Sequence, residues 1–113
     1  MSDDKKTIGV TRENQAALSN LVDGGYFASE IDAAKFAMAH AIKNDLQSRR
    51  TPGADTKWNV GSVDPDGTLA ALLRTLYPET CEPYRLLEDL INVGLADLTV
   101  GDRSPDVYKT MFG

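Results

Sequence analysis

The start of the chain alternates between apolar and polar positions, as expected for a strand. In residues 5–11, Ile8 and Val10 share one face, whereas Thr7 and Gly9 share the other. The segment is also rich in β-branched residues, which favour extended backbone. We therefore predict a short strand here.

A first helix is expected directly after this strand. Thr11 has the right type and position for an N-cap, and Gly24-Gly25 supplies a stop signal. Between them, apolar residues recur at helical spacing: Ala17, Leu18, Leu21 and Val22. The pattern predicts a helix over residues 12–23.

A second helix is predicted from the N-cap candidate Ser29 to about Leu46. Its apolar stripe is so wide that only a narrow line through Asp32, Lys35 and Lys43 is clearly polar. A helix of this kind is buried on more than one side, so we expect it to need neighbours, either in its own chain or in another one.

The second half of the chain predicts two further helices. Residues 57–60 are a candidate extended segment, and Asp64-Pro65 is a candidate helix start. The third helix carries the stripe Leu69, Leu72, Leu73, Leu76 and Tyr77. The fourth is introduced by Thr80 and Pro83 and is expected to end near Gly94, at a C-cap-like position.

These elements predict a mainly α fold of the α+β type with one or two short strands. A strand-helix-helix half at residues 5–46 is followed by a polar connection at residues 47–56 and a helical half at residues 57–113. The chain has 113 residues, the usual size of one domain, so we expect residues 1–113 to share one core.

Composition restricts the class of protein. The content of 42% hydrophobic and 26% charged residues is ordinary globular usage, and no uncharged run is long enough to span a bilayer. One cysteine cannot form an internal disulfide, so we expect a cytoplasmic protein without membrane contact. The net charge of −5 counts against broad nonspecific binding of nucleic acid.

The order of strand, helix, glycine turn and longer helix in residues 5–46 resembles the ribbon-helix-helix family. The residues that carry the resemblance are Lys5 to Thr11, Leu18 and Leu21, Gly24-Gly25-Tyr26, and Ser29-Glu30-Ile31. The resemblance implies that two chains pair their strands and that the ribbon enters the major groove of DNA. Its DNA contacts would map to Lys5, Thr7 and Gly9, with Ala28 and Ser29 at a phosphate.

Two features depart from that family's pattern. A glycine occupies the middle of the strand, and Glu30 stands beside the phosphate position. The alternative is that the strand pairs within its own chain, with residues 57–60 as its partner, and that both helices pack on the second half.

A second resemblance extends further along the chain. It rests on Phe27-Ala28-Ser29, Asp32 to Ala37, Trp58, and Glu88 to Leu95, which look like small bacterial proteins found beside DNA-phosphorothioation (Dnd-type) phage-defence systems. The resemblance implies an accessory role in defence, through contact with larger proteins or DNA, and carries over no catalytic residue.

Basic residues are densest around the polar connection, at Lys43, Arg49, Arg50 and Lys57. Together with Trp58 they form a candidate phosphate-binding patch, and the alternative is a solvated linker beside a structural tryptophan. His40 is the only histidine and lies near the apolar stripe of the second helix, which indicates a core or boundary position.

No catalytic, cofactor or metal motif is recognisable. The glycine pair lacks the spacing of a phosphate loop, and Asp64-Pro65-Asp66-Gly67 fits a cap and turn better than a calcium loop. A hydrolase or nuclease built on scattered carboxylates is the lowest-ranked alternative; its candidates are Asp64, Asp66, Glu88 and Asp89. We therefore expect no enzyme, no cofactor and no small-molecule substrate.

The sequence favours a non-catalytic interaction or accessory protein, homodimeric and bound to a larger protein partner, with phage defence as the setting. The motivation is the nearly all-round apolar second helix. The alternative is a DNA-binding regulator of the ribbon-helix-helix type.

Overall fold

The computed structural model describes residues 4–48 and 53–99. Along the chain lie β1 (Thr7–Val10), α1 (Arg12–Asp23), α2 (Glu30–Lys43), β2 (Asp55–Asn59), α3 (Val60–Val63), α4 (Thr68–Leu76) and α5 (Pro83–Thr99). The predicted fold class is confirmed, because the described chain is mainly helical with two short strands. The four-residue helix α3 was not predicted.

Helix α1 has the predicted boundaries because both of its ends are set by local residues. The hydroxyl of Thr11 accepts a hydrogen bond from the Asn14 amide at 3.2 Å. At the other end Gly25 has a φ of 81°, and the amide of Tyr26 bonds the carbonyl of Leu21 at 3.2 Å. This is the Schellman arrangement, in which a residue with positive φ closes the last helical turn.

Helix α2 begins as predicted but ends three residues early, at Lys43 instead of Leu46. Ser29 caps its start by accepting a bond from the Asp32 amide at 3.2 Å. Asp45 has a φ of 50°, and the Leu46 amide bonds the carbonyl of Ala41 at 2.9 Å. A second Schellman arrangement thus ends the helix, with Asp in the place that Gly usually takes.

Helix α4 begins at Thr68, three residues after the proline at which we predicted its start. Asp64 is nevertheless its capping residue: the carboxylate accepts bonds from the amides of Leu69 at 2.9 Å and Ala70 at 3.1 Å. Residues 65–67 form the intervening turn, in which Gly67 has a φ of 75°.

Helix α5 continues through Gly94, where we predicted a C-cap, and ends at Thr99. Gly94 is the point where α5 meets the backbone of α2. A Cβ atom at this position would overlap the carbonyl oxygen of Ala37 and lie 2.7 Å from its carbonyl carbon. The glycine therefore permits close helix packing and does not end the helix.

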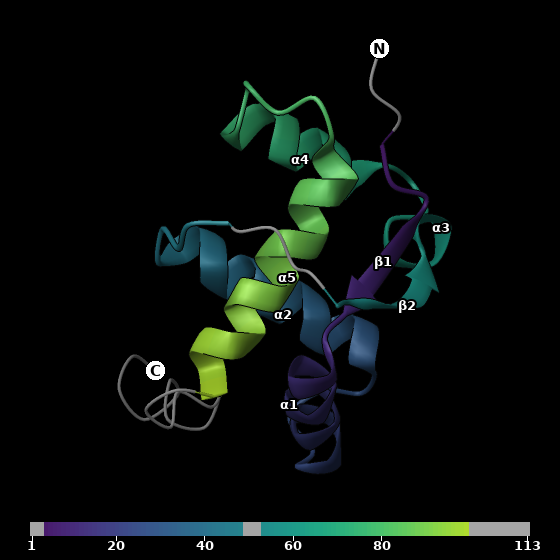
Figure 1. The fold of residues 1–113 in the computed structure, drawn as a ribbon, viewed down its shortest axis with the longest axis vertical. Coiled ribbons are helices and arrows are strands. Elements are labelled where there is room, and N and C mark those ends of the chain that lie inside the picture. Colours follow the sequence, from purple (N-terminus) through teal and green to yellow (C-terminus); the bar gives the residue numbers. More distant parts are fainter. Residues whose placement is uncertain (1–3, 49–52, 100–113) are drawn as a thin grey trace.

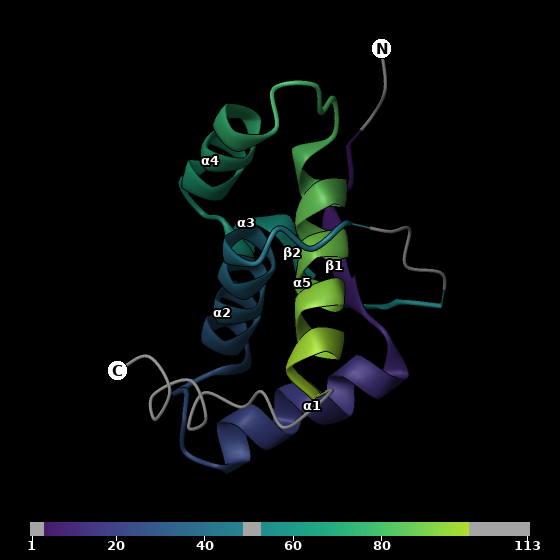
Figure 2. The ribbon, with the colours of Figure 1, turned by 90° about the vertical axis from the view of Figure 1, so that its left-hand side faces the viewer.

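Helices α2 and α5 form the centre of the fold (Figure 1). Helices α1 and α4 lie at opposite ends of α5, and both views show the same order (Figure 2). One core joins the two halves of the chain, and its fully buried side chains include Ile8, Leu18, Leu73, Leu87, Leu90, Ile91 and Leu95. The wide apolar stripe of α2 is covered by α1 and α5 of its own chain.

The two strands form an antiparallel sheet within one chain. Thr7 lies opposite Asn59 and Ile8 opposite Trp58, and after a register shift Gly9 lies opposite Thr56. The pairing is the intrachain alternative that the sequence left open. The predicted connection at residues 47–56 is also shorter than expected, because Asp55 and Thr56 are the first residues of β2.

Candidate functional site

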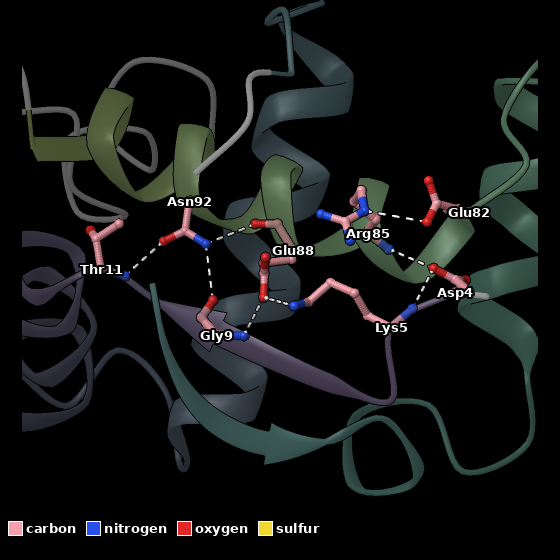
Figure 3. Close-up of polar contacts among 8 residues, drawn as sticks. All are labelled: Asp4, Lys5, Gly9, Thr11, Glu82, Arg85, Glu88 and Asn92. Carbon is pink, nitrogen blue, oxygen red and sulfur yellow. Dashed lines mark hydrogen bonds and ion pairs between the residues drawn. The ribbon is translucent and has the colours of Figure 1, made fainter. Parts of the chain in front are cut away.

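The outer edge of β1 is covered by polar side chains of α5. The Gly9 amide donates to Glu88 Oε1 at 2.6 Å, and Asn92 Nδ2 donates to the Gly9 carbonyl at 3.0 Å (Figure 3). Asn92 Oδ1 accepts from the Thr11 amide at 3.1 Å. These side chains take the place that a further strand would occupy, and the other edge of β1 is paired with β2.

The two α5 side chains in this network are buried but satisfied. Glu88 is 5% exposed and also lies 3.4 Å from the Lys5 ammonium. Asn92 Oδ1 receives a second bond, from Asn14 Nδ2, at 2.9 Å. Buried polar groups that are fully bonded stabilise one arrangement of the chain, so this network fixes the sheet on α5.

Asp4 ties the start of the chain to the same helix. Its carboxylate accepts bonds from the amides of Tyr84 at 2.8 Å and Arg85 at 3.1 Å, in the first turn of α5. Figure 3 shows the bond from Arg85. A carboxylate is favoured at this position because the first amides of a helix have no partner inside the helix. The capping residue is thus about eighty positions away in the sequence.

The three candidate DNA contacts do not form one free surface. The ammonium of Lys5 lies beside Glu88, and Thr7 is a half-buried residue of β1. The hydroxyl of Ser29 is used as the cap of α2. Gly9, the middle position of the ribbon model, is buried against α5.

The two described residues of the candidate basic patch, Lys43 and Lys57, lie at opposite ends of α2. Lys57 lies 2.9 Å from Glu30, the first residue of α2, whereas Lys43 is the last residue of the same helix. A rise of 1.5 Å per residue separates these helix ends by roughly 20 Å. Arg49 and Arg50 lie outside the described residues.

The ion pair with Lys57 perturbs the titration of Glu30. The hydrogen bond from Lys57 is the main cause that lowers the pKa of this carboxyl below its ordinary value, and partial burial opposes the effect. Gln15 adds a further hydrogen bond at 2.8 Å. Lys57 therefore forms an ion pair that joins β2 to α2 within the chain.

His40 is 4% exposed and sits between the two central helices. Its Nε2 lies 2.6 Å from Asp97 Oδ2, and its Nδ1 lies 3.2 Å from the side-chain amide of Asn44. The prediction of a core or boundary imidazole is confirmed, since both ring nitrogens have partners within the fold.

The carboxylates that we considered for a hydrolase have structural partners. Asp64 caps α4 and also accepts a bond from the Tyr84 hydroxyl at 2.8 Å. Asp66 accepts a hydrogen bond from the Thr68 amide, and Glu88 accepts one from the Gly9 amide of β1. Within the described ranges, no three His, Cys, Asp or Glu side chains are grouped as metal ligands. Cys81 is exposed and its thiol is free.

Among the described residues, three large hydrophobic side chains are exposed, and two of them lie on α4; the third is Tyr26, in the turn after α1. Leu72 and Leu76 are 40% and 46% exposed and are one helical turn apart, so they share a face. Leu73 and Ala70 of the same helix are buried against the core. The apolar stripe of α4 is therefore wider than the surface that α5 covers.

An open hollow of about 500 Å³ adjoins this face, where the chain turns from α4 into α5. Its lining is Leu76, Tyr77, Pro78, Glu79, Thr80 and Leu86. Burial and the nearby charge of Asp45 raise the pKa of the Tyr77 phenol above its ordinary value. The negative charge of Asp45 therefore acts on one residue of the lining, and Glu79 supplies a carboxylate in the lining itself.

From the sequence we predicted Leu72 and Leu76 as part of the apolar stripe of this helix, but the pattern did not distinguish its buried positions from its exposed ones. The available signal was the width of that stripe, which runs from Leu69 to Tyr77 with five apolar positions. The hollow itself depends on the angle between α4 and α5, which no local pattern specifies.

Comparison with family models, curated proteins and solved structures finds no match for this chain. In the part of the chain that the structure describes, no helix has the length and apolar character needed to cross a membrane.

Proposed function

We propose that the chain is a non-catalytic interaction protein that binds a larger protein through α4. The observation that carries this proposal is the pair Leu72 and Leu76, two large apolar side chains exposed side by side next to a hollow. Exposed apolar groups that adjoin a hollow are a feature of protein-binding sites. We call the surface formed by Leu72, Leu76 and the hollow the α4 face.

The observation that led us to expect a homodimer has an explanation within a single chain. Helix α2, whose apolar stripe suggested a second chain, is covered by α1 and α5. The proposal therefore rests on α4 and on a different protein as partner. The setting in phage defence stays a prediction from resemblance.

The ribbon-helix-helix alternative also stays a prediction, and the structural observations favour the α4 face over it. A ribbon needs a free edge on β1, yet Gly9 bonds Glu88 and Asn92 on one edge and β1 pairs with β2 on the other. The net charge of −5 adds repulsion from DNA phosphates.

Site-specific cross-linking in the cells that make the protein tests the proposal. A photoreactive residue at Leu72 should give an adduct with one distinct polypeptide, and the same residue at Asn20, exposed on α1, should not. Replacing Leu76 with serine should abolish the Leu72 adduct. The proposal fails if Leu72 gives no adduct or if both positions give the same products.

A further inference from the structure

The hollow beside Leu76 is suited to side chains of a partner and not to a whole helix. Its volume of about 500 Å³ is within the range of sites that enclose small groups, and it opens to solvent. Leu76, Tyr77, Pro78 and Leu86 supply apolar walls. An inserted large apolar side chain would be in contact with these walls while its backbone lay along Leu72.

The one charged residue that lines the hollow is acidic. Glu79 lines it, and Asp45 is close enough to act on the Tyr77 phenol. Arg74 is two residues from both Leu72 and Leu76, so it lies about 200° around the helix from each. Its positive charge acts instead on the Tyr84 phenol, whose hydroxyl bonds Asp64.

This charge pattern opposes a second copy of the chain as the occupant. A two-fold dimer through the α4 face would place the carboxylates of both copies in one interface, and none of the residues that line the hollow is basic and could pair with them. Helix α4 has nine residues and is roughly 13 Å long, which is short for a stable interface of about 800 Å² per partner. A basic segment of another protein supplies the opposite charge and, as a transient partner, can bind through a smaller area.

We propose that the α4 face docks an amphipathic helical segment of a partner protein. The segment inserts a large apolar side chain beside Leu76 and places lysine or arginine next to Glu79 and Asp45. In helix-in-groove binding the docked segment carries apolar anchors one turn apart, and Leu72 and Leu76, one turn apart on α4, offer two neighbouring apolar contacts for such anchors. This inference rests on the proposed function and specifies the chemistry of the partner.

Two designed peptides test the inference. Both are alanine-based helices of about 16 residues, long enough to be partly helical alone, with identical leucine and phenylalanine anchors. One carries lysines beside the anchors and the other carries glutamates. Binding is followed through the amide resonances of the isotope-labelled full chain, which also show where each peptide binds.

We expect the lysine peptide to shift the resonances of residues 72–86 and to bind roughly fivefold more tightly than the glutamate peptide, as expected for two partly exposed ion pairs. Glu79→Gln and Asp45→Asn should each reduce this preference, and asparagine tolerates the positive φ of Asp45. Glu13→Gln, which removes an exposed carboxylate on α1, should leave it unchanged.

Equal affinity of the two peptides, or a preference that survives both substitutions, would overturn the inference. So would the absence of any shift at residues 72–86. The proposed function is tested separately, because an adduct at Leu72 in cells requires only that some protein contacts the α4 face.

Discussion

Replacing Gly94 with alanine should destabilise the contact between α2 and α5. The added Cβ would overlap the Ala37 carbonyl, which is backbone and cannot rotate away. Overpacking of this kind costs about 1–3 kcal/mol, and the upper end applies because a helix must shift. Alanine recovers about 1 kcal/mol of helix propensity, so we expect a net loss of about 2 kcal/mol.

Thermal and urea unfolding followed by circular dichroism measure this change. A loss of about 2 kcal/mol corresponds to a melting temperature lower by about 8 °C for a chain of this size. Gly61→Ala is the matched control, because Gly61 lies in α3 with nothing within 4 Å of the added Cβ. A Gly94→Ala variant as stable as the wild type would refute the account of the helix contact.

Three further predictions concern polar contacts. Asp64→Asn should lower the stability by about 2 kcal/mol in urea unfolding, because it weakens charge-assisted bonds to α4, while Asp66→Asn at an exposed site should change little. Asn92→Leu should cost about 3 kcal/mol, because it leaves several buried groups unpaired; an unchanged midpoint would contradict the network. Because folding lowers the pKa of Glu30, the ionised carboxylate stabilises the fold. This stabilisation is fully present above the ordinary pKa of 4.5 and is lost as the pH falls through the lowered pKa. Glu30→Gln should therefore cost about 0.5 kcal/mol at pH 7 and flatten the fall in stability under acid conditions, as should Lys57→Met.

The elements that the sequence predicted best are those whose ends depend on neighbouring residues. Helix α1 has both predicted boundaries, because Thr11 and Gly25 act within one turn of the helix. Helix α2 ended early because Asp45 adopts a positive φ, which aspartate does less often than glycine. The proline after Asp64 led us to predict an earlier start for α4. Asp64 does cap this helix, but it stands three residues before the N-cap position, Gly67.

Other features depend on contacts between distant residues and had no local signal. Gly94 resembles a C-cap in sequence, and only the approach of Ala37 shows that it is a packing residue. The capping of α5 by Asp4 and the cover of Gly9 by Glu88 each join positions about eighty residues apart. The same holds for the α4 face, since the exposure of Leu72 follows from how α4 packs on α5.

The central claim is that one chain completes its own sheet and core and leaves the α4 face for a different protein. The absolute mass in solution, measured by light scattering across a range of concentrations, tests it most directly. The account predicts 12.3 kDa at every concentration. A concentration-stable dimer would contradict it: loss of that dimer in Leu76→Ser would mean that a second copy occupies the α4 face, and its persistence would mean that another surface joins the chains.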